Sequence, residues 1–266
     1  MTKTSYTSCA TKPEEVVICS ALDAGNYPAE YSERISKILK YIPDENLRAK
    51  VKQTLGEFGT GADGKLAQSS PYKLVVLQEI IPKGKVLVAR PRLQIAKENN
   101  PDFMSGFYVD CDLNLVSAQD GYKMNPVPAK ELAEDLKSVG IDLESAKLIP
   151  YHILTHEINE NSPSGLVFKL SKEGKDTAKK LVLNTNDFNW RYNPSNSGLF
   201  RAYLDADGDW DAGDGDLANS NDDGRVVVET TGGAGSRELE DLKREAENLY
   251  NRQRKERGLL VTKLLA

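Results

Sequence analysis

The sequence has few of the residues on which disulfides, metal sites and nucleic-acid binding depend. Its 266 residues include three cysteines and two histidines, and 40 acidic against 35 basic side chains give a net charge of −5. Cys9, Cys19 and Cys111 are widely spaced and form no CxxC pair, so we expect reduced structural thiols rather than disulfides or a zinc site. The acidic balance argues against a nucleic-acid partner, which requires a basic surface.

Long apolar segments are also missing. No run of about 18 apolar residues occurs, so the sequence predicts no membrane span. Met1 to Ala10 are polar and contain no signal-peptide core, which predicts a cytoplasmic protein unless it is exported by another route. Hydrophobic residues make up 39% and charged residues 28% of the chain, as in an ordinary globular protein of one large or two small domains.

The N-terminal part has a helical pattern. Apolar residues recur at helical spacing over 32–55, with an interruption at Pro43. The next segment, 56–70, is rich in glycine and polar residues and is predicted to be a loop or linker. We therefore expect an N-terminal helical region over 1–70, packed on the following domain or separate from it.

The middle of the chain mixes strand and helix patterns. Residues 72–81 and 86–93 are rich in β-branched side chains and predict a hairpin, and the alternation over 107–116 predicts a half-buried strand. A helix is predicted over 128–139, because proline lies near its start and Gly140 follows its end.

The C-terminal half continues this mixture. Residues 145–157 read as a helix or a mixed segment, and 165–170, 179–184 and 226–228 read as strands. A charged helix with a thin apolar stripe is predicted within 237–266. The predicted class is α+β, with its main domain over 71–229.

His152 and His156 are the only histidines, and Glu157 follows them. If the segment were helical, the two rings would share one face and could bind zinc. A metalloprotease places the glutamate between its histidines, as HExxH, whereas the order here is HILTHE and no third ligand is evident. We favour two structural histidines, and a metal-dependent hydrolase using these three residues stays an alternative.

The segment 205–216, DADGDWDAGDGD, alternates carboxylates with small residues. Calcium loops use such spacing because Ca²⁺ takes six to eight oxygen ligands. An EF-hand needs glycine at its sixth position and glutamate at its twelfth, but counting from Asp205 gives Trp210 and Asp216. A calcium-stabilised structural module of another type is therefore an alternative, and a solvated acidic loop is the simplest interpretation.

The whole stretch from Asn184 to Glu229 has a composition of its own. It opens on an apolar strand with Trp190 and NPSNSG, and closes on LANSN and GRVVV. Between them stand clustered Asp, Gly, Ala, Tyr and Phe. This order closely resembles the variable region of proteins diversified by diversity-generating retroelements, and it is similar to archaeal and candidate-phylum members of that group.

The resemblance implies a C-type-lectin-like fold and a binding function without catalysis or cofactor. In that family mutation of template adenines overwrites asparagine codons, and Asp, Gly, Ala, Ser and Tyr are among the outcomes. It implies fixed positions at Trp190, Pro194, Leu217 and 226–228, with Trp210 either framework or contact. It implies variable, solvent-facing ligand-binding residues at Phe200, Tyr203, Asp205, Asp207, Asp209, Asp211, Gly213, Asp214, Gly215, Asp216, Asp222 and Asp223.

The composition of this stretch independently favours binding over catalysis. Tyr, Ser, Gly and Asn supply the aromatic area and adaptable hydrogen bonding of paratopes, and the aspartates predict a protein or other macromolecular ligand with a basic surface. No GxSxG, GxxxxGK[ST] or GxGxxG motif occurs. Formylglycine-generating enzymes share the C-type-lectin-like fold but use paired cysteines, and no cysteine follows Cys111.

Overall fold

A computed structural model gives the architecture of most of the chain. It describes residues 16–18, 27–81, 93, 96–97, 106–119, 121–185, 197–205, 209–213 and 215–229. These contain five α-helices, a mixed eight-stranded sheet and two smaller sheets, so the α+β class is confirmed. The predicted helix in 237–266 lies outside the described residues, as do Cys9, Cys19, Trp190 and Pro194.

Two helices form the N-terminal region, as predicted. α1 (Tyr27–Lys40) and α2 (Glu45–Thr54) are separated at Pro43. The Asp44 carboxylate caps α2 by accepting the Leu47 N–H at 2.7 Å. The buried hydroxyl of Tyr31 donates to the Leu55 carbonyl at 2.8 Å and so joins the two helices at their inner faces.

The prediction of a strand over 72–81 is wrong, because this segment forms the helix α3 (Pro71–Ile80). Ser70 is its N-cap, Pro71 is its first residue, and every residue from Tyr72 to Leu77 is buried. A helix covered on all sides shows no polar face, so a short apolar run cannot distinguish it from a buried strand. Of the second predicted strand only Leu93 is described, and it is helical.

The large sheet is built around one long strand. β4 (Tyr108–Ser117), predicted over 107–116, pairs with β9 (Gly198–Leu204) on one edge and with β5 (Lys147–Pro150) and β11 (Gly224–Arg225) on the other. The pairing with β11 is parallel and the other two are antiparallel. The remaining strands are β2 (Gly59–Thr60), β3 (Leu66–Ala67), β8 (Leu183–Asn184) and β10 (Trp210–Asp211).

Two further sheets and two helices complete the described fold. β6 (Leu154–Ile158) and β7 (Leu166–Leu170) form a hairpin, and β1 (Val16–Ile18) pairs with β12 (Val227–Glu229). The other helices are α5 (Pro126–Ser138), which confirms the predicted helix, and α6 (Lys172–Leu181). The strand predicted over 179–184 is confirmed only for β8. Residues 179–181 instead form the C-terminal end of α6, whose N-cap is Ser171.

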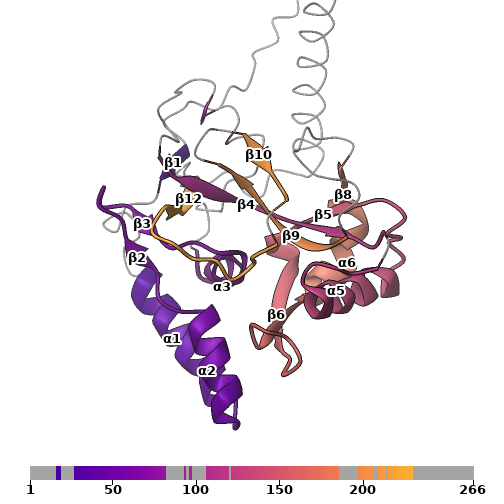
Figure 1. The fold of residues 1–266 in the computed structure, drawn as a ribbon, viewed down its shortest axis with the longest axis horizontal. Coiled ribbons are helices and arrows are strands. Elements are labelled where there is room, and N and C mark those ends of the chain that lie inside the picture. Colours follow the sequence, from indigo (N-terminus) through magenta and orange to yellow (C-terminus); the bar gives the residue numbers. More distant parts are fainter. Residues whose placement is uncertain are drawn as a thin grey trace, which may run out of the picture.

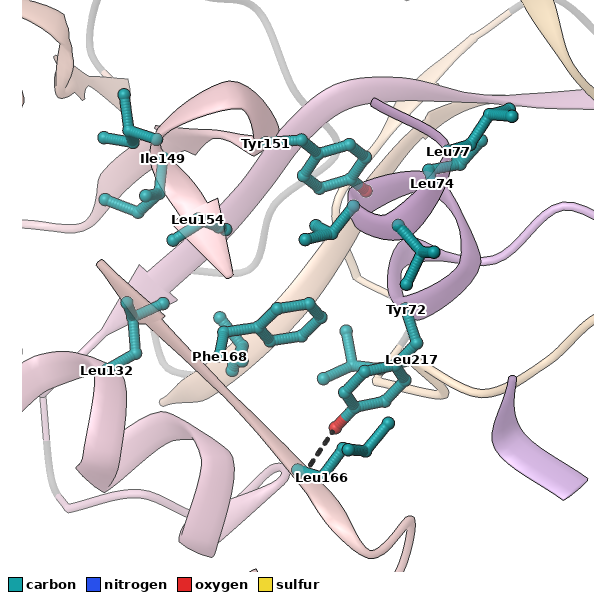
Figure 2. Packing of buried hydrophobic residues seen from close by; sticks show 14 of the residues in the cluster. Tyr72, Leu74, Leu77, Leu132, Ile149, Tyr151, Leu154, Leu166, Phe168 and Leu217 are labelled. Carbon is teal, nitrogen blue, oxygen red and sulfur yellow. Dashed lines mark hydrogen bonds between the residues drawn. The ribbon is translucent and has the colours of Figure 1, made fainter. Parts of the chain in front are cut away.

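Apolar side chains gather on both faces of β4. The larger cluster lies on the side where the helices pack, below the sheet in Figure 1. Its centre includes Tyr72 of α3 stacked on Phe168 of β7, with ring centroids 4.6 Å apart (Figure 2). A second cluster includes Cys111 and Trp210. Cys111 is a free, buried thiol, as expected, and donates to the Ala202 carbonyl at 3.0 Å.

Candidate ligand-binding surface

β9 places part of the predicted variable region inside the sheet. Its seven residues were not predicted as a strand, yet they pair with β4 along most of its length. Phe200 is fully buried in the second apolar cluster, so its predicted solvent-facing position is wrong. Tyr203 is half-buried and meets Tyr108 edge-on at 6.0 Å between ring centroids.

The start of β9 requires a glycine. Gly198 has φ of +132°, and a Cβ there would lie 2.0 Å from the main-chain oxygen of Met124. The close approach lets the Leu199 N–H donate to the same oxygen at 3.1 Å. β9 is thereby joined to the chain that enters α5, which brings residues far apart in sequence to one side of the candidate surface.

A buried ion pair crosses from β9 to β4. Arg201 is 1% exposed, and its Nε and Nη2 donate to the two carboxylate oxygens of Asp110 at 2.8 and 2.6 Å. Ser69 adds a third donor to this carboxylate at 2.9 Å. The guanidinium also lies over the rings of Tyr108 and Tyr203, at 4.8 and 5.5 Å from their centroids. Arg201 is therefore fixed in one geometry.

The same guanidinium holds the chain that follows β10. Its Nη1 donates to the main-chain oxygens of Asn219 at 3.3 Å and Asp216 at 3.5 Å. Asn125, before α5, donates from Nδ2 to the Gly215 carbonyl and to the Leu199 carbonyl. Arg225 donates to the Asp222 carbonyl and pairs with Asp63 at 3.1 Å. We call residues 215–223, held in this way, the anchored segment.

The anchored segment is also fixed by the hairpin of β2 and β3. The Ser220 hydroxyl donates to the main-chain oxygen of Gln68, and the Gln68 side chain donates to Asp222 at 2.7 Å. Gln68 itself adopts a left-handed conformation with φ of +65°. Leu217 is buried, as expected for a fixed position, and so are Val226 to Val228.

Most of the described aspartates in the predicted site face solvent. Asp209, Asp216, Asp222 and Asp223 are exposed, Gly213 is exposed, and Asp205 and Asp211 are half-buried. Gly215 is buried against Met124, so its predicted solvent-facing position is wrong. Trp210 is 7% exposed and packs in the second apolar cluster. Asp207 and Asp214 lie outside the described residues.

The two histidines do not share a helix face. Residues 145–157 form β5, a 3₁₀ turn (Tyr151–Ile153) and β6, so the helical interpretation of this segment is wrong. His156 packs against both rings of the stacked Tyr72–Phe168 pair, with ring centroids 5.7 and 5.3 Å away. Burial, and secondarily the charge of Arg34, lowers the pKa of His156 to about 3, so the ring is neutral at pH 7.

The structure groups no ligand set for the zinc site proposed at the two histidines or for the calcium site proposed over 205–216, as far as these residues are described. Within the described part of the chain, no three His, Cys, Asp or Glu side chains are grouped so that they could hold a metal ion. This includes His152, His156 and Glu157, and those aspartates of 205–216 that are described. Three of these aspartates instead accept main-chain N–H groups close in sequence, as Asp205 does from Asp209 at 2.7 Å.

Comparison with family models, curated proteins and solved structures finds no match to this chain. Within the described residues, no helix has the length and apolar character needed to cross a bilayer.

Proposed function

We propose that the chain is a ligand-binding receptor of C-type-lectin-like fold, whose surface over 205–223 is diversified by a retroelement. The partner is a macromolecule with a basic surface, and no catalytic step is involved. The observation that carries the proposal is how the anchored segment is held. Asn125, Arg201 and Arg225 all bind its main-chain oxygens, so the backbone is fixed while side chains such as Asp216 and Asp223 point outward.

Main-chain anchoring is what a diversified surface needs. A loop held through its own side chains changes shape when those side chains change, whereas carbonyl oxygens are present at every residue. Loops positioned by a rigid scaffold are also the usual site of binding function. The exposed carboxylates of Asp209, Asp216 and Asp223 give this variant its charge and therefore its preference for cationic surfaces.

The DNA around the coding sequence tests the retroelement part of the proposal. We expect a reverse-transcriptase gene nearby and a near-repeat of the 3′ coding end that differs only where the repeat has adenine. The coding sequence and its repeat should be identical at the codons of the anchoring and buried residues Arg201, Trp210 and Arg225. Asn125 lies before the diversified stretch and therefore outside the repeat. A repeat with mismatches spread evenly over all four bases contradicts diversification.

The binding part is tested with a defined cationic probe. An octalysine peptide is titrated at low salt into the wild type and into the variant Asp209→Asn/Asp216→Asn/Asp223→Asn. Three surface ion contacts of ordinary strength correspond to about a tenfold loss of affinity, which should shrink at 0.15 M salt.

The matched control removes three exposed charges elsewhere, as Glu30→Gln/Glu144→Gln/Glu173→Gln. We expect its affinity for octalysine to stay within about twofold of the wild type, because each charge lies off the candidate surface. Equal losses in the two variants would mean that the peptide responds to net charge alone, and the assignment of the surface would be wrong.

A further inference from the structure

A pocket of about 260 Å³ lies beside the anchored segment, at the meeting point of four elements. α2, the turn between β6 and β7, the start of α5 and residues 216–218 each contribute part of its lining. The Thr54 hydroxyl donates to the Ser164 carbonyl at 2.9 Å and joins α2 to the turn. Asn125 joins the start of α5 to the anchored segment through the Gly215 carbonyl. The pocket is therefore bordered by two pairs of elements, each joined by a hydrogen bond.

The wall formed by α2 and the turn offers hydrogen-bond donors. Lys50 and Gln53 lie on α2 with exposed side chains, and the buried Ser162 contributes a hydroxyl that is within 2.9 Å of the Ser164 hydroxyl. Lys50 forms no ion pair with any described residue, whereas Lys169 and Lys175 pair with carboxylates of α5. An ammonium group at a pocket without its own counter-ion favours a ligand that carries a negative group.

The second wall, formed by the start of α5 and residues 216–218, offers acceptors. The Asn125 side chain commits its Nδ2 to two carbonyl oxygens, which leaves Oδ1 as its acceptor, and Asp216 contributes a carboxylate. The start of α5 adds little positive character, because Pro126 and Pro128 have no N–H and the Ala129 N–H is bonded to the Asn125 carbonyl. This wall suits an ammonium group rather than an anion.

The remaining lining combines the hydroxyl-bearing side chains of Thr54, Ser164 and Tyr72 with small apolar surfaces. Leu217, Pro128 and Pro163 lie among the polar groups, and Leu217 approaches the Tyr72 ring in the core (Figure 2). The volume falls just below the roughly 300–1,000 Å³ of sites for drug-sized molecules, so the ligand must be small. Donors on one wall, acceptors on the other and a short apolar surface match a zwitterion with a compact side chain.

We propose that this pocket binds a free α-amino acid, with its carboxylate toward Lys50 and its ammonium toward Asn125 and Asp216. Such a site goes beyond the proposed receptor function and does not depend on it, since most of its lining lies outside 205–223. Residues 216 and 218 form one edge of the pocket. A change at position 216 would remove one of the two acceptors for the ammonium group, whereas a change at position 218 would leave the contacts with Lys50, Asn125 and Asp216 in place.

The test is a titration of isotope-labelled full-length protein with L-alanine and L-leucine, followed by chemical-shift changes at Gln53, Ser162 and Ala218. We expect saturable shifts, and at least about tenfold weaker binding of propanoate and of isopropylamine, each of which lacks one of the two charges. Equal binding of these analogues, or binding of glucose but of neither amino acid, would overturn the assignment.

Two lysines on one helix supply the matched variants. Lys50→Met should weaken amino-acid binding about tenfold by removing the charge-assisted contact. Lys52→Met removes the same charge from an exposed position of α2 that does not line the pocket, and binding should stay within about twofold. The amino-acid titration contains no basic macromolecule. Its failure would therefore contradict only the pocket assignment, and failure of the octalysine experiment would contradict only the proposed receptor surface. Unchanged binding in Lys50→Met would place the ligand elsewhere.

Discussion

The helix-side core and the anchored segment are held in opposite ways. In the core, side chains contact side chains: Tyr72 stacks on Phe168 at 4.6 Å between ring centroids, and α1, α2, α3 and α5 contribute apolar groups to one cluster. In the anchored segment, framework side chains such as Arg201 contact main-chain oxygens. The core is therefore defined by the side chains it contains. The segment is held mainly by side chains that surround it, and Ser220 and Asp222 add side-chain hydrogen bonds to Gln68.

The largest effect is expected where the two regions meet, at Arg201. Arg201→Met leaves the Asp110 carboxylate buried without its bidentate partner and releases the main-chain oxygens of Asp216 and Asn219. Breaking one side of a buried pair costs about 3–5 kcal/mol of unfolding free energy, measured by urea denaturation. The double variant Arg201→Met/Asp110→Leu should recover part of the loss, because no uncompensated charge remains. A single variant within 1 kcal/mol of wild type, on the order of one lost neutral hydrogen bond, contradicts this role.

Phe168 lies in the helix-side core and is fully buried against Tyr72 and His156. Phe168→Ala removes packing contacts and leaves a cavity, so unfolding free energy should fall by about 3 kcal/mol. Phe168→Leu keeps most of the volume and should cost clearly less, below about 1.5 kcal/mol. If the two variants were equally damaging, ring stacking rather than filled volume would hold this part of the core.

Asp112 provides a contrast, because it lies two residues after Asp110 on β4 but pairs with no arginine among the described residues. Its Oδ1 is enclosed and has no hydrogen-bond partner in the part of the chain that the structure describes, and burial raises its pKa to about 7. A raised pKa in the folded state means that the unfolding free energy falls as pH rises from about 4 through 7.

Asp112→Asn cannot ionise, so the variant should gain about 2 kcal/mol over wild type above pH 7, after allowance for partial exposure of the side chain. Near pH 4 the two proteins should be nearly equal. The measurement is urea unfolding at pH 4, 6 and 8, with Asp223→Asn, an exposed change, as the control. A stability difference that did not vary with pH would mean that Asp112 is solvated.

The sequence predicted helices and strands correctly where the spacing of apolar residues fitted only one type of secondary structure. The α1–α2 pair, β4, α5 and β7 follow from periodicity and from Pro43, Pro128 and Gly140. α3 was missed because a helix buried all round has no polar face. β9 was missed because it lies within a stretch dominated by Asn, Asp and Gly, and because GLFRAYL is buried on both faces and shows no apolar–polar alternation.

The candidate surface was only partly predictable for a similar reason. Exposed aspartates such as Asp209 and Asp223 could be named from composition, but Phe200 and Gly215 were placed outside when they are buried. The anchors could not be named, because Arg201 and Asp110 are 91 residues apart in the chain. A charged residue inside an apolar strand, as Arg201 is in β9, was the available signal for a buried pair.

The smallest effect is expected from the exposed side chains of the anchored segment, and it is the sharpest test of the comparison. Asp216→Ala and Asp223→Ala leave every framework contact to a main-chain oxygen in place. Each should change unfolding free energy by less than about 0.5 kcal/mol, as for ordinary surface substitutions. Asp222→Ala serves as the contrasting variant, because its carboxylate accepts from Gln68. A loss above 1.5 kcal/mol at Asp216 or Asp223, beyond the typical net worth of one hydrogen bond, would show that the segment depends on its own side chains. A surface of that kind could not be diversified without losing its shape.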